Sequence, residues 1–384
     1  MAAMLCAPAC QLYAVGQAVQ WDLERTVTIG DAMDGETGLT RVGDVTIAGD
    51  RVLVGQPMER RVRVFSTRGE FIGFVGRQGA GPGEFEGLGR IGLLGDMFWV
   101  WDYHLNRIEY FSANYDHVST LSLRGHPSVS ASGLHLAGVL RDSSILARVM
   151  SSAAVAVSAP RAPEWLLRLD PKGFLRDSVA ILRGIVPETE VIDGLQSDRR
   201  LYMTRPVFDR SLVAVWPDGS GFVVVDRESA AERVRHRYRV TKFDADADTV
   251  FRRDYPYEPI PISSAWLSRR VDQATGVHAG NRWGIVANRR RFRLAVREAF
   301  SDLEYFPAVA AVEAGPNGTT WLLRRIDEDS FEWEVLDTAG FPIGRFEEPP
   351  GARLAAAADL GGAWFHERDE LDVPYIVRYE FRDR

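Results

Sequence analysis

The stretch from Gly49 to Gly76 reads GDRVLVGQPMERRVRVFSTRGEFIGFVG and contains three short β-rich segments separated by polar turns. A second stretch from Gly95 to Leu123, GDMFWVWDYHLNRIEYFSANYDHVSTLSL, repeats the same order of strands and turns. Self-similarity with a period of about 40–50 residues is typical of β-propellers, in which each blade is one small sheet. The repeat therefore predicts an architecture. It does not predict an activity, because one fold hosts many functions.

Two strands of the repeat can be counted independently. The apolar centres of the second strand lie at Val52, Phe98, Ile145, Phe222, Trp321 and Trp364. The third strand begins at Arg61, Arg107, Trp165, Tyr238, Glu332 and Tyr375. Both counts give six, so we predict an all-β fold, a six-bladed β-propeller with four-stranded blades, and not a two-sheet sandwich of similar hairpins.

The sixth unit lacks a fourth strand, because the chain ends at Arg384. Near the N-terminus, WDLERTVTIG from Trp21 to Gly30 is a strand candidate without a repeat of its own. An open ring would leave an unpaired strand edge, which is an aggregation hazard. We therefore expect the N-terminal strand to close the last blade.

Two insertions interrupt the repeat, at 184–204 and near 263–304. We expect the first to be a loop between blades. In the second, Phe292, Val296 and Phe300 recur at helical spacing, which predicts one or two helices over a face or rim of the ring. We expect residues 15–384 to form a single propeller domain that includes this helical insertion, and residues 1–14 to be the remnant of a signal peptide or a disordered N-terminus.

The composition argues against nucleic-acid binding. The formal net charge is −7, from 46 basic and 53 acidic residues, and NRRRFRLAVR from Asn288 to Arg297 is the one long basic run. Proteins that bind nucleic acids usually show a strong basic footprint. We interpret this run as a solvated helix whose arginines pair with Glu298, Asp302 and Glu304. No stretch reaches the length of a transmembrane helix.

The N-terminus carries a weak export signal. Ala7-Pro8-Ala9 fits the A-x-A pattern that precedes a signal-peptide cleavage point, but the basic n-region is missing and the apolar run is short. We therefore expect a periplasmic or secreted protein, with a lipid anchor on Cys10 as a variant and an unstructured cytoplasmic N-terminus as the alternative. Cys6 and Cys10 are the two cysteines, so we expect no disulfide in the folded body.

The turn after the first repeat carries a family resemblance. Arg61 to Gly92 contains Gly79-Ala-Gly-Pro-Gly-Glu-Phe85, and this passage resembles an NHL-type repeat of the six-bladed propellers common among exported bacterial proteins. The resemblance implies a fold and an interaction surface but no single reaction. Glycine supplies the positive φ that such a turn needs, and we expect Phe85 to pack as an anchor between blades. No Gly-Lys-Ser/Thr follows, so a phosphate-binding loop is excluded.

No catalytic or metal-binding motif is evident. No two of the seven histidines have the spacing of metal ligands, and the serine-hydrolase motif G-x-S-x-G is absent. Asp244-Ala-Asp-Ala-Asp248 begins like a calcium loop but has Thr249 in place of the required glycine, so we interpret it as a turn between strands. We expect no cofactor and no resident metal.

Topology places the candidate site. In a propeller, the loops between second and third strands share one face with the loops that join blades. These loops carry charged and aromatic residues that could bind a ligand at the mouth of the channel: Arg60, Asp102, Tyr103, His104, Asn106, Arg107, Asp226, Asp327, Glu328 and His366. The contrary interpretation is that loops are simply polar.

Our functional hypothesis is a monomeric, non-enzymatic binding propeller that recognises a protein, peptide or glycan through this face. The rival is a metal-assisted hydrolase or lyase, resembling propeller lactonases or the amidating lyase, with ligands converging on the axis. Three or more His, Asp or Glu side chains meeting at one axial point would favour the rival.

Overall fold

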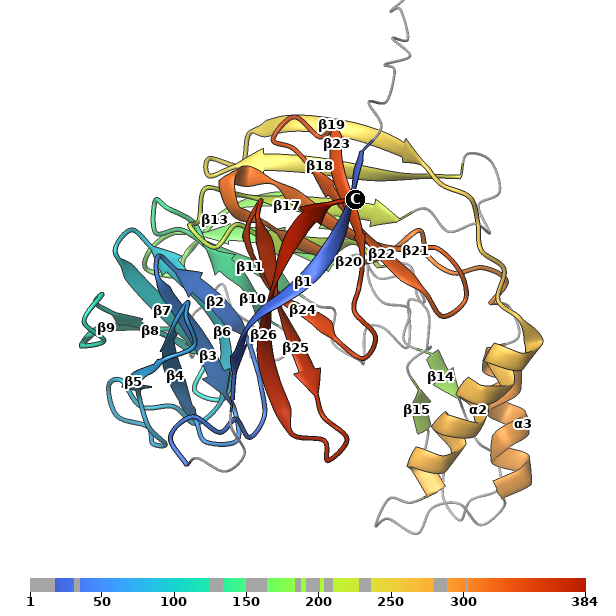
Figure 1. The fold of residues 1–384 in the computed structure, drawn as a ribbon, viewed down its shortest axis with the longest axis horizontal. Helices are drawn as coiled ribbons and strands as arrows, with labels where there is room; N and C mark the ends of the chain where they lie inside the picture. The colour runs from blue at the N-terminus through green and yellow to red at the C-terminus, as the bar shows by residue number, and fades with distance from the viewer. Residues whose placement is uncertain are drawn as a thin grey trace, which may run out of the picture.

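The fold is a ring of twisted sheets around a central axis, seen in a computed structural model (Figure 1). The structure describes residues 18–30, 35–123, 134–149, 164–183, 188–190, 201–203, 210–227, 236–279, 289–300 and 303–384. Within these ranges, no helix is both long and apolar enough to cross a bilayer.

Six four-stranded antiparallel blades follow one another along the chain, each with its first strand nearest the axis. Blade 1 comprises β2 (Val45–Ala48), β3 (Arg51–Gln56), β4 (Arg61–Ser66) and β5 (Phe71–Val75). Blade 2 comprises β6 (Leu88–Leu94), β7 (Met97–Asp102), β8 (Arg107–Phe111) and β9 (His117–Ser122). Blade 3 comprises β10 (Leu134–Val139), β11 (Ile145–Val149), β12 (Glu164–Leu169) and β13 (Leu175–Leu182).

The second half of the ring repeats this order. Blade 4 comprises β16 (Leu212–Val215), β17 (Gly221–Arg227), β18 (Arg237–Asp244) and β19 (Thr249–Pro256). Blade 5 comprises β20 (Val309–Ala314), β21 (Thr320–Arg325), β22 (Phe331–Leu336) and β23 (Pro342–Glu347). Blade 6 comprises β24 (Arg353–Asp359), β25 (Gly362–Arg368), β26 (Pro374–Asp383) and β1 (Val19–Ile29). Every predicted second and third strand is confirmed.

The N-terminal strand closes the ring, as predicted. β1 pairs antiparallel with β26 from Trp21 opposite Asp383 to Ile29 opposite Ile376. Its first residues also pair in parallel with β23, so blades 5 and 6 form one continuous sheet of eight strands. The Trp21 ring stacks on Phe381 with centroids 4.8 Å apart. The first and the last strand of the described chain therefore share one set of hydrogen bonds.

Burial follows the position of each strand in its blade. In β3, five of the six residues are buried, because both faces of a second strand pack against neighbouring blades. The fourth strands β5 and β19 consist of intermediate and exposed residues, apart from the buried Val75 at the end of β5, because they form the outer rim. Phe85 is fully buried in a cluster that joins blades 1 and 2, and its ring lies 6.0 Å from that of Phe111. The predicted anchor between blades is thus confirmed.

A common turn joins the third and fourth strands. In blades 1 to 5 a side-chain oxygen accepts the N–H groups two and four residues later, and the residue before the second of these has positive φ; in blade 2 the oxygen is Ser112 Oγ. In the other four blades the oxygens belong to Ser66, Asp170, Asp244 and Asp337. Asp244 to Asp248 is therefore a turn, as the sequence indicated.

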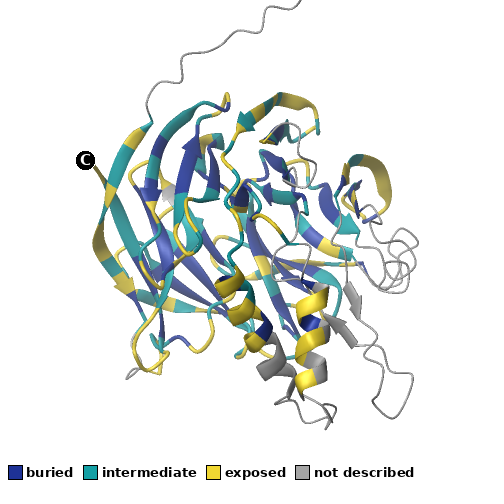
Figure 2. Cartoon of the chain, turned by 90° about the vertical axis from the view of Figure 1, so that its right-hand side faces the viewer, coloured by how far each residue is buried: buried dark blue, intermediate teal, exposed yellow. Residues whose placement is uncertain are grey.

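Two helices, α2 (Ser264–Ala279) and α3 (Arg289–Ala299), occupy the predicted insertion between blades 4 and 5. They attach to blade 5: Trp266 packs edge-on to Phe306, at a centroid distance of 4.9 Å, and Ser263 Oγ donates a hydrogen bond to Glu328. Figure 2 shows buried residues in the ring interior and mostly exposed ones on these helices. Of the predicted loop 184–204, the structure describes the short strands β14 (Glu188–Glu190) and β15 (Leu201–Met203).

Because consecutive strands of a blade run antiparallel, their connecting turns lie alternately on two opposite faces of the ring. Turns between first and second strands, such as 49–50, 95–96 and 315–319, lie at one end, which we call the first-turn face. Turns between second and third strands, such as 57–60, 103–106 and 326–330, lie at the other end, the second-turn face. The ten candidate residues predicted from the sequence lie in or beside the turns of the second-turn face.

Candidate functional site

The first strands of five blades enclose a cavity of about 410 Å³ on the axis of the ring. We call it the channel cavity. Its walls come from β2, β6, β16, β20 and β24, and its end at the first-turn face is bordered by Gly49, Pro217 and the turn 316–318. The β24 wall consists of Ala355, Ala356 and Ala357, whose small side chains leave space in the centre.

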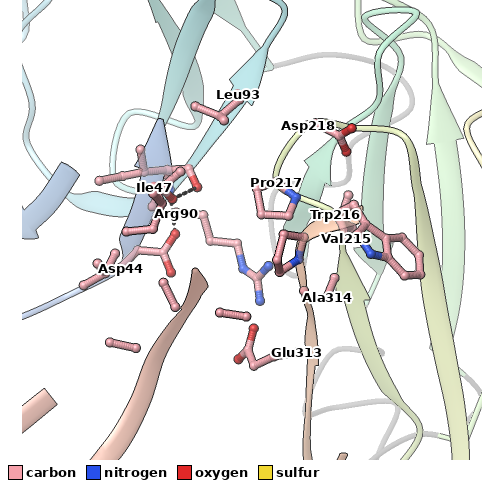
Figure 3. Close-up of a pocket in the computed structure, with 18 of the residues that line it drawn as sticks. Asp44, Ile47, Arg90, Leu93, Val215, Trp216, Pro217, Asp218, Glu313 and Ala314 are labelled. Carbon is pink, nitrogen blue, oxygen red and sulfur yellow. Dashed lines mark hydrogen bonds between the residues drawn. The ribbon is translucent and has the colours of Figure 1, made fainter. Parts of the chain in front are cut away.

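Four ionisable side chains line this cavity, and one of them, Asp218, is paired with Arg141 at 3.2 Å. The other three come from different blades. Asp44 directly precedes β2, Arg90 lies on β6 and Glu313 lies on β20 (Figure 3). Figure 3 shows the guanidinium of Arg90 extending into the cavity, with Asp44 and Glu313 on different sides of it. A site with one cation and two carboxylates is thus assembled by the closure of the ring.

One carboxylate oxygen of Asp44 takes part in a hydrogen bond within the cavity wall. Its Oδ2 accepts the Ile91 N–H at 2.8 Å, and Thr46 Oγ1 donates to the Ile91 carbonyl at 2.9 Å, so blades 1 and 2 are joined along their first strands. Burial raises the pKa of Asp44, while Arg90 and the Ile91 N–H oppose the rise. One carboxylate oxygen of Asp44 is left to face the cavity.

Arg90 is held by a single hydrogen bond, from one terminal nitrogen to the Ala137 carbonyl at 3.0 Å. No carboxylate in the described ranges lies within 4.0 Å of its guanidinium. A guanidinium carries five N–H donors in a planar fork. Most of the donors of Arg90 are therefore available to water or to a ligand.

Glu313 has an unusual protonation equilibrium. Its side chain is exposed to the channel, but the surrounding walls of the ring place many protein atoms near it, and the resulting loss of hydration raises its pKa to about 7. Arg90 opposes the rise and the negative charge of Asp44 adds to it. Near neutral pH, Glu313 can therefore either donate or accept a hydrogen bond.

Most of the candidate residues predicted in blade 2 serve the fold. Asp102 is fully buried and accepts four backbone N–H groups, including Glu86 at 2.8 Å and Leu105 at 2.9 Å. Asn106 holds a positive φ in the same turn. Tyr103 and His104 are exposed and pack edge to face, with centroids 4.6 Å apart. These two side chains are the ones in this turn that a partner could reach.

Arg107 clamps the glycine-rich turn. Its terminal nitrogens donate to the carbonyls of Ala80, Gly81 and Glu84 at 2.7–2.8 Å. Its Nε lies 2.6 Å from the fully buried carboxylate of Glu109. Arg107 therefore joins the turn to its own blade, and it does so through Glu109 and the turn carbonyls instead of through Asp102.

The remaining candidates are spread over the other blades. Arg60 pairs with Glu86 at 3.1 Å, and Asp226 accepts a hydrogen bond from Ser211 Oγ at 2.7 Å. Asp327 caps its own turn by accepting the Asp329 and Ser330 N–H groups, and Glu328 is bonded to the helical insertion. His366 is half-buried; its Nε2 has no hydrogen-bond partner within the described ranges, and burial lowers its pKa. None of the ten lines the channel cavity.

Asp44, Arg90 and Glu313 were not among the residues predicted from the sequence. Their signal was a charged residue within or beside an otherwise apolar first strand, as in RIGLL from Arg90 and AAVEA from Ala310. A charge there must face the axis, because the opposite face of the strand packs in the blade. Among the described residues, no three of the His, Cys, Asp and Glu side chains group in a way that could hold a metal ion.

Comparison with known proteins supports the fold. Residues 35–128 match a family described as a 6-bladed beta-propeller, DUF5128, a range that spans blades 1 and 2. The chain is therefore similar to this family over about a quarter of its length. A comparison with curated proteins finds no match.

Solved structures align over nearly the whole ring. A DUF4221-family protein from Bacteroides vulgatus has a TM-score of 0.53 and 9% identity, over 96% of this chain and 99% of that one. A candidate exported protein from Bacteroides fragilis has a TM-score of 0.50 and 10% identity, over 94% and 95% of the two chains. A luciferin-regenerating enzyme aligns at a TM-score of only 0.41, too low to bear on function. At these identities the likeness concerns the fold alone.

Proposed function

We propose that the protein is a non-catalytic binding propeller that takes the polar end of a peptide or glycan into the channel cavity. The observation that carries this proposal is Arg90, a solvent-exposed cation that extends into the channel cavity with a single hydrogen bond and no carboxylate within 4.0 Å in the described ranges. Its guanidinium therefore keeps several N–H donors free for the polar acceptor groups of a ligand. A volume of about 410 Å³ also lies in the range of small-ligand sites.

The channel cavity lies on the axis, whereas the sequence predicted a site in the loops of the second-turn face. Of the ligand classes inferred from the sequence, peptides and glycans still fit the cavity. A whole protein surface could not enter the cavity, whereas the end of a peptide or a glycan could. Tyr103 and His104 on the second-turn face remain the alternative contact surface, because they are exposed and form one aromatic patch. We further propose that the protein is an exported, NHL-like monomer. Ala7-Pro8-Ala9 and the exported candidate among the similar structures support this setting.

The test is a binding screen with a library of short peptides and a library of short oligosaccharides, measured by thermal shift. Compounds that stabilise the wild-type protein should lose at least tenfold in affinity for Arg90→Ala and for Glu313→Gln. The double variant Tyr103→Ala, His104→Ala should bind them as the wild type does. The opposite pattern would assign the site to the second-turn face and refute the channel proposal.

The enzymatic rival has one observation in its favour. Glu313, with a pKa of about 7, can take up and release a proton near neutral pH, and Asp44 lines the same cavity as a second carboxyl group. A hydrolase or lyase would therefore use Glu313 as general acid or base. Bound compounds recovered chemically changed from the wild type, but unchanged from Glu313→Gln, would establish the rival and refute the binding-only proposal.

A further inference from the structure

A second hollow lies between blades 1 and 2 on the first-turn face. It has a volume of about 550 Å³ and is lined by the turns 49–51, 95–96 and 113–115 together with side chains of the strands beneath them. We call it the interblade groove. It is as large as many small-ligand pockets, yet it is open along the surface and could hold an extended chain.

The groove and the channel cavity adjoin. Gly49 and Leu93 line both of them, and Gly49 stands in the turn that leads from the axial strand β2 outward to β3. Gly49 has positive φ, and a β-carbon added to it would have no neighbouring atom within 4 Å, so the passage at this turn is open. A ligand whose end occupies the channel can therefore continue into the groove.

The floor of the groove is apolar and its rim is polar. Leu53 and Phe98 are buried beneath it, and Met97 and the partly exposed Ile72 also line it. Asn114 and the glycines of two turns lie at its edge. An extended peptide matches this arrangement, because its side chains can contact an apolar floor while its backbone bonds to polar rim groups.

The charge of the combined surface is negative. Five carboxylates line the two hollows, against the two guanidinium groups of Arg90 and Arg51. The carboxylates belong to Asp44, Asp50, Asp96, Asp218 and Glu313. Arg51 is already paired with Asp50 at 2.5 Å, and Asp218 with Arg141 at 3.2 Å. Glu313 and Asp96 form no ion pair within the described ranges, so the surface favours a cationic ligand end.

We propose that the ligand is an extended peptide whose free amino terminus enters the channel beside Glu313 and whose next residues lie in the interblade groove. This inference rests on the proposed function and adds the chemical class and the path of the ligand. The ammonium group is complementary to Glu313 and Asp44, and the first peptide carbonyls can accept from Arg90. A glycan has no cationic end and would gain nothing from this charge.

The experiment compares three synthetic probes: a library of hexapeptides with free amino termini, the same library with acetylated termini, and a dipeptide library with free termini. The free hexapeptides should bind at least tenfold more tightly than either of the other two libraries. Equal binding of acetylated hexapeptides would overturn the role of the ammonium group. Equal binding of dipeptides would overturn the groove while leaving the channel function intact.

Matched variants separate the groove from the channel. Ile72→Arg places a long cation in the groove, on the fourth strand of blade 1, and should reduce hexapeptide binding to the level of dipeptide binding. Ile181→Arg makes the same change on the exposed fourth strand of blade 3, away from both hollows, and should have no effect. Oligosaccharide binding that is lost in Glu313→Gln, with no peptide binding, would overturn this inference and uphold the channel function. Absence of both would refute the channel function itself.

Discussion

Arg107 and Arg90 are both arginines of blade 2, and they differ in what surrounds them. Arg107 lies between a glycine-rich turn and a buried glutamate, with three carbonyls and one carboxylate as partners. Arg90 lies on the axis with one carbonyl as its partner. A buried cation held by several carbonyls and a carboxylate stabilises the fold, whereas a cation with spare donors in a cavity is available to a ligand. The partners of an arginine, more than its conspicuous position in a loop, indicate its role.

Removing β1, which closes the ring, should have the largest effect and should affect Arg90 more than Arg107. The surroundings of Arg107 come from blades 1 and 2 alone, but the channel around Arg90 needs the closed ring. Removal of β1 should lower the free energy of unfolding by more than about 4 kcal/mol or cause aggregation, because it exposes the edges of β26 and β23. Urea unfolding with light scattering measures this effect. A chain beginning at Ala18 is the control, and equal midpoints for the two chains would contradict the closure.

Arg107→Ala should have the next largest effect. It leaves Glu109 as a buried charge without its arginine and removes the donors to Ala80, Gly81 and Glu84. Removing one partner of a buried ion pair costs about 3–5 kcal/mol. Arg107→Lys keeps the charge without the planar fork and should lose less. Urea unfolding that shows a loss below about 1 kcal/mol, together with weaker ligand binding, would mean that Arg107 serves the site instead.

Arg90→Ala should show the reverse pattern. It removes one hydrogen bond at the wall of an open channel, so the free energy of unfolding should change by less than about 1 kcal/mol. Binding of the stabilising compounds should fall at least tenfold, as measured by calorimetry. A large loss of stability with unchanged binding would make Arg90 a structural residue like Arg107.

The smallest effect concerns pH. The pKa of Glu313 rises from an ordinary value of 4.5 to about 7 in the folded protein, so the folded state binds this proton more tightly than the unfolded state. The resulting stabilisation is complete below about pH 4.5 and is lost as the pH rises through 7. The melting temperature of the wild type should therefore fall more steeply between pH 5 and 8, roughly the range in which this carboxyl titrates, than that of Glu313→Gln.

The control for this comparison is Glu370→Gln, which changes an exposed glutamate in a turn of the second-turn face. Its melting curve should follow that of the wild type across the same pH range. Parallel curves for the wild type and Glu313→Gln would show that Glu313 is not enclosed in the way that the cavity suggests.

The sequence was sufficient to predict the ring because its signals are local. The apolar centres at Val52 and Trp364 and the turn that ends at Phe85 each identify a strand or a blade boundary without reference to the rest of the chain. The closing strand followed from counting. These features depend on burial and turn geometry, and both can be inferred from the pattern of apolar and turn-forming residues in a short segment.

The channel site could not be predicted in the same way. Asp44, Arg90 and Glu313 belong to three blades, and a charge in or beside one apolar first strand does not show which charges of other blades it will meet. Only the order of the blades and the size of the ring bring them together. The predicted loop residues Asp102 and Asp327 drew attention because they are charged, but turns also use carboxylates to satisfy their own N–H groups.

The pairing of β1 with β26 also has a kinetic consequence. The paired residues, such as Trp21 and Asp383, are separated by almost the whole described chain. Forming this contact therefore closes a longer loop than any other strand pairing in the ring. Folding slows as the sequence separation of native contacts grows, and we expect β1 to dock after the blades have formed. Substitutions in β1 should then accelerate unfolding while leaving the folding rate almost unchanged, because the transition state has not yet made these contacts. The last strand to dock would then be the one whose partner lies farthest away along the sequence.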